Sequence, residues 1–226
     1  MYGEIAMHDF MTLLDKYGGE TTMTATNVPD GGENKSGGDG GDSGTSGIVA
    51  EGGGGGRVFW DLGSGTGKAV MAAGLCRHFS HSRGVELLPC TAGIAAVLVE
   101  DFARDVLPGA RPGSNPLRSI AVECGDFFAP ACLAQWQAGD FVFCNCVTWD
   151  EDTMERLSAA AEGLRPGAVF VTVLCPLVSH KFELVEEVEI GFSWVRGWLR
   201  GELSHRGKDK INTNVCTLPY TTEYKV

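Results

Sequence analysis

The chain has 226 residues, 43% of them hydrophobic, which is enough for one well-buried α/β domain and too little for two. Its formal net charge of −11, from 18 basic and 29 acidic residues, argues against a surface that tracks a polyphosphate chain. No apolar run is long enough to cross a bilayer, and eight cysteines without a preceding signal peptide indicate a reduced, intracellular protein.

The first predicted element is an amphipathic helix over residues 6–17, in which Phe10 and Leu14 fall on one face. Residues 18–56 are then rich in Gly, Ser, Thr, Asp and Glu and end in consecutive glycines, so we predict a disordered acidic insert. Lengthening a connection from about five to about thirty-five residues costs only ~1.7 kcal/mol of closure entropy. The helix can therefore still dock on the domain that follows the insert.

A glycine turn follows the insert. Residues 58–61 predict a buried strand and residues 68–78 a helix, and Gly63, Gly65 and Gly67 lie between them. The third glycine comes two residues after the second, whereas the dinucleotide fingerprint has three. This spacing favours a nucleotide without a pyrophosphate, with S-adenosylmethionine (SAM) as the leading case. An ordinary strand–helix turn that binds nothing is the alternative.

The remaining elements alternate between strand and helix. Strands are predicted over residues 81–86, 118–123, 140–146 and 168–175, helices over residues 90–107, 129–137 and 151–164, and a loop over residues 108–116. Residues 182–194 and 211–224 alternate in polarity and predict an antiparallel pair at one edge. The pattern predicts an α/β fold with a doubly wound, seven-stranded sheet and a closing antiparallel hairpin.

Polar or aromatic residues follow three further strands. Ligands of doubly wound sheets lie beyond the carboxyl ends of the strands, so these positions are candidate contacts. Glu86 suits a carboxylate that accepts from both ribose hydroxyls, while Asp126 and Phe127 can accept from an adenine amino group and stack on its ring. Asn145 interrupts an apolar strand. Each residue taken singly can also be a solvated turn acid or a hydrogen bonder at a loop start.

The same motifs, taken in order, resemble those of a known family. They are Tyr2-Gly3-Glu4 before an amphipathic helix, the 61–67 glycine turn, Gly84-Val85-Glu86, Gly125-Asp126-Phe127 and Phe143-Cys144-Asn145. Together they resemble the Dot-type (disruptor of telomeric silencing) histone H3 lysine N-methyltransferases, which are class I SAM-dependent enzymes without a SET domain. The Tyr-Gly-Glu element is the specific part. The insert and the short acidic form are similar to protozoan, kinetoplastid-like members.

The resemblance implies a division of the chain and a set of cofactor contacts. Residues 1–17 would form a cofactor-covering loop and helix, residues 18–56 the insert, and residues 57–226 the SAM-binding core. Tyr2 and Glu4 would lie in the loop over SAM. The other implied cofactor-binding residues are Asp61, Gly63, Gly65, Gly67 and Lys68 for the methionine part, Glu86 for the ribose, Asp126 and Phe127 for the adenine, and Asn145 near the transferred methyl.

The resemblance also implies a catalytic end of the site. Asn145 would face the place where the target lysine meets the methyl group, and Trp149 and Trp198 are candidate aromatic residues of the lysine channel. Methyl transfer needs no nucleophile on the enzyme, because the neutral amine attacks in line, so catalysis would consist of alignment in a narrow dry channel. Packing in the core or at a sheet edge is the alternative for each tryptophan.

Several positions depart from the family pattern. Ile5 replaces a Thr, Lys68 replaces a Gln, and an Asn-rich aromatic stretch has become residues 146–149. Tyr220 is the nearest candidate for the late channel Tyr. Family members carry a helical segment upstream of Tyr-Gly-Glu, so we expect a truncated copy, a fragment of a longer chain, or a partner that supplies this part of the channel.

The expected partner is histone H3 in the nucleosome, in the nucleus, and the acidic charge favours basic protein over DNA. No DNA-binding basic tail is evident, because residues 206–210 are short and mixed in sign. No metal site is predicted, since Cys144 and Cys146 have no second pair at metal spacing. A class I methyltransferase with another substrate, or a SAM-binding scaffold that transfers nothing, is the alternative function.

Overall fold

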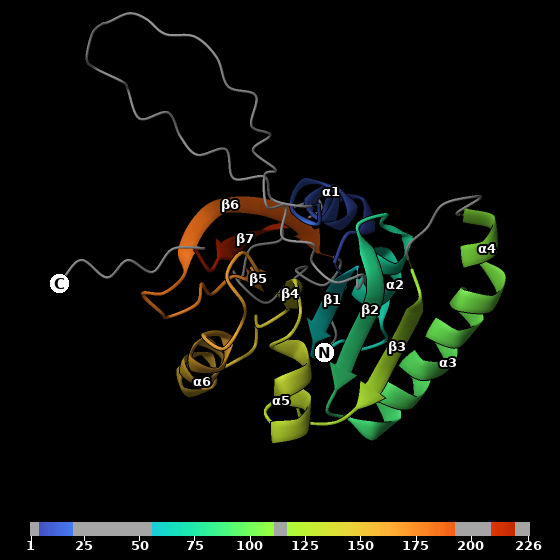
Figure 1. Ribbon diagram of the computed structural model, residues 1–226, viewed down its shortest axis with the longest axis horizontal. Coiled ribbons are helices and arrows are strands. Elements are labelled where there is room, and N and C mark those ends of the chain that lie inside the picture. The colour runs from blue at the N-terminus through green and yellow to red at the C-terminus, as the bar shows by residue number, and fades with distance from the viewer. Residues whose placement is uncertain (1–4, 20–55, 111–116, 193–208, 220–226) are drawn as a thin grey trace, which may run out of the picture.

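The computed structural model describes residues 5–19, 56–110, 117–192 and 209–219, which form a seven-stranded sheet with helices on both faces (Figure 1). The strand order is β3-β2-β1-β4-β5-β7-β6. β1 pairs in parallel with β2 and β4, and the order reverses between them. The predicted doubly wound sheet with its antiparallel closing pair is therefore confirmed, and it is the sheet of class I SAM-dependent methyltransferases.

The parallel part of the sheet holds the buried strands. It consists of β1 (Arg57–Leu62), β2 (Phe79–Glu86), β3 (Ser119–Cys124), β4 (Phe141–Cys144) and β5 (Val169–Val173). The antiparallel part is β6 (Glu183–Phe192) and β7 (Asp209–Thr217), with β7 paired to β5. All five residues of β5 are buried, as expected of a strand covered on both faces.

The helices are divided between the two faces. They are α1 (Met7–Tyr17), α2 (Lys68–Leu75), α3 (Pro89–Asp105), α4 (Leu107–Ala110), α5 (Pro130–Trp136) and α6 (Glu151–Ala161). Side chains alternate along the strands, so Phe59 and Phe143 join one apolar cluster with α1, α2 and α3. Trp60 and Phe170 join a second cluster with α5 and α6. The sheet thus separates two cores.

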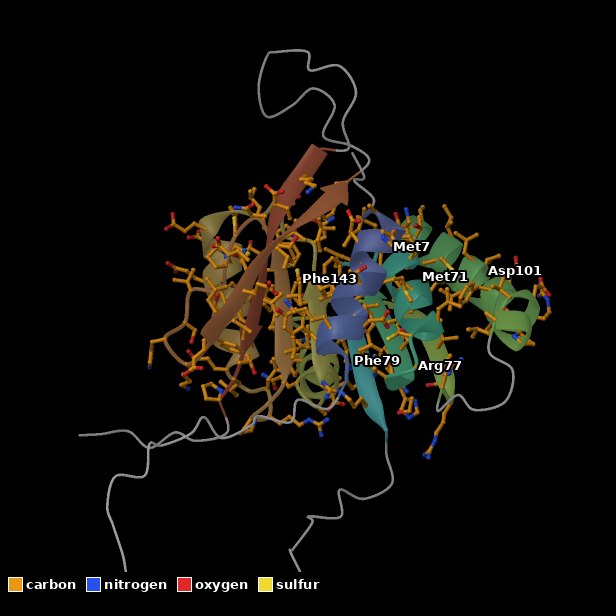
Figure 2. The ribbon with its side chains drawn as sticks, turned by 90° about the horizontal axis from the view of Figure 1, so that it is seen from above. Met7, Met71, Arg77, Phe79, Asp101 and Phe143 are labelled. Atoms are coloured by element: carbon orange, nitrogen blue, oxygen red, sulfur yellow. The ribbon has the colours of Figure 1, made fainter. Side chains whose placement is uncertain are left out.

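Helix α1 docks on the first core although residues 20–55 separate it from β1 in the sequence. The Phe10 side chain is fully buried, with its ring 4.8 Å from that of Phe143 and 6.3 Å from that of Phe59. At the β6 edge of the sheet, Ile5 forms an antiparallel bridge with Phe192. Figure 2 shows α1 beside α2, with Met7 and Met71 on the two neighbouring helices. The predicted docking of this helix is confirmed.

Element boundaries differ from the sequence predictions at several ends. β5 ends at Val173 instead of residue 175, because Leu174 has a left-handed backbone with φ of 71°. α2 ends at Leu75 instead of residue 78, since Cys76 is extended. The structure also shows helix α4 over Leu107–Ala110, which overlaps the start of the predicted 108–116 loop; Pro108 fits there because proline is tolerated in the first turn of a helix.

Two further strand and helix ends come earlier than predicted. β4 ends at Cys144, so Asn145 lies just past the strand, and α6 ends at Ala161 instead of residue 164. Within the described residues, no helix has the length and apolar character needed to span a membrane. The division of the chain at residues 17 and 56 stays a prediction, because most of the insert lies outside the described residues.

The packing of Phe10 predicts a large loss of stability in Phe10→Ala. Removing a fully buried aromatic ring leaves a cavity between α1 and the sheet, and the free energy of unfolding should fall by about 3–5 kcal/mol. Urea denaturation followed by circular dichroism measures this. The exposed neighbour His8 provides the control His8→Ala, which should change stability by less than about 0.5 kcal/mol. Equal small effects of both variants would contradict the docking of α1.

Candidate functional site

The glycine turn between β1 and α2 is held against the neighbouring strand. The amide N–H groups of Gly63 and Ser64 both donate to the carbonyl oxygen of Val85 at the end of β2, at 2.9 and 3.0 Å. Gly63, Gly65 and Gly67 all have positive φ, of 77°, 55° and 81°. A side chain would be strained at each position, so the turn needs glycine for its backbone conformation.

Gly67 has a second reason to be glycine. A Cβ atom there would lie 2.9 Å from a methyl carbon of Val99 and 3.2 Å from one of Val122, which are packed core side chains. This glycine therefore allows α2 to approach α3 and β3 closely. It faces the core, whereas Gly63 and Gly65 line the cavity described next.

A cavity of about 1010 Å³ opens beyond the carboxyl ends of β1, β2 and β4. Its position at the reversal of strand order is where ligands of doubly wound sheets bind. Twenty-two residues line it: Ile5, Asp61, Gly63, Ser64, Gly65, Thr66, Lys68, Ala69, Glu86, Leu87, Leu88, Asp126, Phe127, Phe128, Phe143, Asn145, Val147, Thr148, Trp149, Asp150, Thr153 and Arg156. Its volume is sufficient for a nucleoside-sized cofactor and part of a substrate.

Glu86, the last residue of β2, is tied to the backbone around it. One carboxylate oxygen accepts from the amide of Gly65 at 2.9 Å, and the other accepts from the amide of Leu88 at 2.9 Å. The residue is only 6% exposed. These two bonds fix the orientation of the carboxylate, and each oxygen retains a lone pair for a further donor in the cavity.

Asp61, near the end of β1, is buried close to Glu86. Burial, together with the smaller effect of the negative charge of Glu86, raises the pKa of the Asp61 carboxyl to about 8. The residue is 3% exposed and lines the cavity. A cationic group next to Asp61 would reverse this effect and stabilise the ionised carboxylate.

Asn145 lines the cavity and has an unpartnered acceptor in its side chain. Its side-chain oxygen Oδ1 is buried and has no hydrogen-bond partner within the part of the chain that the structure describes. The hydroxyl oxygen of Ser64 is also buried and has no hydrogen-bond partner among the described residues. Buried polar atoms are normally paired, so an unpartnered acceptor on a residue that lines the cavity is a candidate partner for a donor group of a ligand.

An aromatic cluster forms one end of the cavity. The rings of Phe127 and Trp149 are stacked, with centroids 5.4 Å apart and planes 13° apart, and the Phe128 ring lies 4.4 Å from that of Phe127. A Cβ atom on Gly63 would lie 3.8 Å from Trp149, so the indole ring lies over the glycine turn. Trp149 therefore belongs to the same end of the cavity as Phe127.

Three further residues of the lining belong to, or pack against, the other core. Ile5 and Phe143 belong to the cluster around α1, and Val147 packs against it. Phe127, Phe128 and Trp149 pack instead against the cluster around α5 and α6. The cavity lining therefore draws apolar residues from both cores, and the polar groups of Asp61, Glu86 and Asn145 are also part of it.

The structure brings together most of the residues predicted as site residues. Asp61, Gly63, Gly65, Lys68, Glu86, Asp126, Phe127, Asn145 and Trp149 line one cavity. Tyr2, Glu4, Trp198 and Tyr220 lie outside the described residues. The Asp126 carboxylate accepts from the Phe128 amide at 2.8 Å and is exposed at the rim.

Sequence reasoning missed three residues of the lining that carry charge or apolar surface. Asp150 accepts from the Thr153 amide at 2.9 Å as the N-cap of α6, and an acidic residue before a helical pattern is a signal for this role. The Arg156 guanidinium lies 4.2 Å from the centre of the Phe128 ring, and no pattern in the sequence pointed to it. Phe143 enters the sequence prediction only as part of the strand end Phe143-Cys144-Asn145, without a role in the site.

The lining is acidic on balance. It contains four carboxyl side chains, Asp61, Glu86, Asp126 and Asp150, and two basic side chains, Lys68 and Arg156. A cavity with this composition favours cationic ligands over anionic ones. The lining combines hydrogen-bond acceptors with aromatic surfaces, and this combination suits a nucleoside that carries a positive charge.

Comparison with known proteins places this site in a family. The family model of the histone methylation protein DOT1 matches residues 54–191, which covers the glycine turn, Glu86, Asp126 and Asn145. Residues 2–4 and most of the insert lie outside the match, so the kinetoplastid-like resemblance stays a prediction. A search of curated proteins finds no match.

Several solved structures have similar folds. An RNA methyltransferase from Salinibacter ruber, in complex with S-adenosyl-L-homocysteine, is 17% identical with a TM-score of 0.49, over 73% of this chain and 82% of that one. The rRNA methyltransferase AviRa from Streptomyces viridochromogenes is 15% identical with a TM-score of 0.47, over 71% and 76% of the two chains. A putative RNA methyltransferase from Pyrococcus horikoshii is 15% identical with a TM-score of 0.44, over 74% and 76%.

The buried Asp61 predicts a pH dependence of stability that Asp61→Asn abolishes. Below its ordinary pKa of 3.8, Asp61 is protonated in both the folded and the unfolded chain. Between 3.8 and about 8 only the unfolded chain ionises, so the free energy of unfolding should fall as the pH rises, and above about 8 this contribution should stay constant.

Urea denaturation at a series of pH values measures this slope in the natural protein and in Asp61→Asn. The exposed Glu100 on α3 provides the matched control Glu100→Gln, which should keep the slope of the natural protein. An unchanged slope in Asp61→Asn would show that the Asp61 carboxyl does not have a raised pKa.

Proposed function

Since the chain belongs to the DOT1 histone methylation protein family, whose members use SAM as the methyl donor, we propose that it methylates a lysine of histone H3 in the nucleosome. The observation that carries the proposal is the buried, unpartnered Oδ1 of Asn145 in a cavity shared with Asp61 and Glu86. An acceptor in this position can orient a donor N–H group without adding a charge.

The residues present fit SAM. Glu86 would accept from the ribose hydroxyls through its remaining lone pairs, and Asp126 and Phe127 would hold the adenine. Asp61 would face the ammonium group of the methionine part, whose positive charge would return the carboxyl to its ionised form. Lys68, the first residue of α2, would balance the carboxylate of that part.

When bound, SAM supplies an electrophilic methyl group that passes to the amine in a single displacement. The chain itself has to align the amine and keep it neutral. Asn145 serves both needs, because its amide oxygen accepts an N–H hydrogen bond while a carboxylate in its place would stabilise the ammonium form. No covalent intermediate on a side chain is required.

The part of the cavity lining that belongs to the core around α1 is the proposed entrance for the lysine. Ile5, Phe143 and Val147 surround the approach to Asn145 with apolar surface. Removing water from the amine there lowers its pKa and so increases the fraction in the neutral, nucleophilic form.

Trp149 has a different proposed role from the channel aromatic that the sequence predicted. Its ring is stacked on Phe127 and lies over Gly63, at the aromatic end of the cavity. We therefore assign it to the adenine side of the cofactor site. The roles of Tyr2, Glu4 and Trp198 stay predictions, and so do nuclear location and the particular lysine.

The net charge of −11 supports a basic protein partner. The acidic cavity lining favours lysine side chains in the same way. Both features agree with a histone substrate and give no advantage to free DNA or RNA, whose phosphates would be repelled.

The cofactor part of the proposal predicts that Glu86→Gln weakens SAM binding by about 10–100-fold, because hydrogen bonds to a charged acceptor are worth about 1.5–3 kcal/mol. Isothermal titration calorimetry with SAM measures the affinity. Glu123→Gln, which changes an exposed carboxylate near the end of β3, should leave the affinity unchanged. Equal affinities for the natural protein and Glu86→Gln would contradict the assignment of Glu86.

The substrate part predicts that the protein transfers label from isotopically labelled SAM to nucleosomes. Mass spectrometry should locate the label on a lysine of the globular part of histone H3. Asn145→Ala should reduce the transfer by at least about 100-fold, which is the usual effect of removing a group that aligns the reacting atoms.

Free histones, RNA and small-molecule extracts serve as alternative acceptors in the same assay. Transfer to one of these and not to nucleosomes would replace the histone proposal with another methyltransferase activity. Tight SAM binding by calorimetry with no transfer to any acceptor would identify a SAM-binding scaffold and overturn the enzymatic proposal.

A further inference from the structure

Three side chains that can ligate a metal ion meet where α1 and α2 end. Asp15 is in the last turn of α1, Cys76 follows the last residue of α2, and His78 lies directly before β2. One ligand atom from each of them lies within 4.8 Å of the other two. Arg77, labelled in Figure 2, lies between Cys76 and His78 in the sequence.

The arrangement differs from that of a catalytic triad. The same carboxylate oxygen of Asp15 lies 3.7 Å from Sγ of Cys76 and 3.9 Å from Nε2 of His78. In a Cys-His-Asp triad the imidazole lies between the thiol and the carboxylate. Here the carboxylate is adjacent to both, so the geometry favours three ligands around one point over a relay from thiol to base.

The separations suit a tetrahedral ion. Ligand atoms about 2.0–2.3 Å from a tetrahedral zinc ion lie roughly 3.3–3.7 Å from one another. The two separations from Asp15, 3.7 and 3.9 Å, are close to this range, and the separation between Cys76 and His78, at most 4.8 Å, has to shorten by no more than about 1.5 Å. A thiolate, an imidazole and a carboxylate together match the mixed ligand preference of Zn²⁺, whereas Mg²⁺ and Ca²⁺ take oxygen ligands.

The three side chains differ in their exposure to solvent, from a buried thiol to an exposed carboxylate, as expected of a metal site that is open to water on one side. Cys76 is 2% exposed and forms the floor, the His78 side chain is 33% exposed, and the Asp15 side chain is 66% exposed. The chain after α1 passes over the imidazole, since a Cβ atom on Gly19 would lie 3.6 Å from the His78 ring. The solvent side leaves room for a water molecule as a fourth ligand.

We propose that Asp15, Cys76 and His78 bind one Zn²⁺ ion, with water as the fourth ligand. The ion would join α1 to the connection between α2 and β2. Asp15 and Cys76, which lie in these two segments, are 61 residues apart in the sequence. It would thereby fasten the helix that precedes residues 20–55 to the domain that follows them.

The bridge has a consequence for the cavity. Helix α1 has 11 residues, so its two ends lie about 16 Å apart, with the zinc cluster at one end and Ile5 of the cavity lining just before the other. An ion bound at the Asp15 end of α1 would restrict the motion of the whole helix. It would also restrict the motion of Ile5, which lines the cavity just before the other end of the helix.

Zinc titration into the metal-free full chain tests the proposal. Calorimetry should find one Zn²⁺ per chain, and Tm should rise with zinc concentration because the ion binds the folded state. Asp15→Asn, Cys76→Ser and His78→Ala should each weaken binding by more than about tenfold, since loss of a group that only supports a ligand already has an effect of that size.

Two substitutions that keep the cluster intact are the controls. Cys90→Ser removes an exposed thiol on α3, and His8→Ala removes an exposed imidazole on α1, so both should retain the zinc affinity of the natural protein. Co²⁺ gives an independent readout, because a thiolate-to-cobalt charge-transfer band should appear in the natural protein and be absent in Cys76→Ser.

Cys76 is buried, so its variant could unfold for reasons unrelated to metal; Asp15→Asn and His78→Ala change more exposed side chains and decide the result in that case. Absence of a one-to-one zinc complex in the natural protein would overturn the proposal. Zinc affinity that survives both Asp15→Asn and His78→Ala would overturn it too, because the ion would then be bound by other cysteines.

Discussion

The site depends on the burial of two carboxylates at the carboxyl edge of the sheet. Asp61 and Glu86 lie at the carboxyl ends of adjacent parallel strands, so ionising both carboxyl groups would place two negative charges close together in a region with little water. Glu86 is stabilised by two backbone amides, one of them from the glycine turn, whereas burial raises the pKa of Asp61 to about 8. A cofactor with a cationic ammonium and sulfonium group relieves this unfavourable electrostatic arrangement, which gives binding a physical driving force.

The two cores of the protein both contribute apolar residues to the lining of the cavity. Alternate residues of the central strands enter opposite clusters, and the cavity lies where both clusters reach the carboxyl edge. Phe127 and Trp149 bring the cluster around α5 and α6 to the lining, and Phe143 brings the cluster around α1. The cofactor contacts and the lysine entrance proposed above therefore draw on different cores.

Helix α1 connects this arrangement to a distant part of the sequence. Phe10 holds it on the first core, while the backbone near Ile5 is bonded to β6 and contributes to the cavity. The proposed zinc ion at Asp15 would act at the opposite end of the same helix. The long connection is tolerated because closure entropy grows only slowly with its length.

The sequence alone determined the order of the strands along the chain, the order of the helices apart from α4, and the residue types at the strand ends, because hydrophobic periodicity and glycine spacing are local properties. It could not determine that Leu174 ends a strand early or that Trp149 stacks on Phe127, since both depend on neighbours distant in the chain. Spacing along the chain likewise argued against a metal site, whereas the tertiary structure brings Asp15 to Cys76 and His78. Local patterns specify which groups are present; only the packing of α1 against α2 and the sheet decides which of them meet.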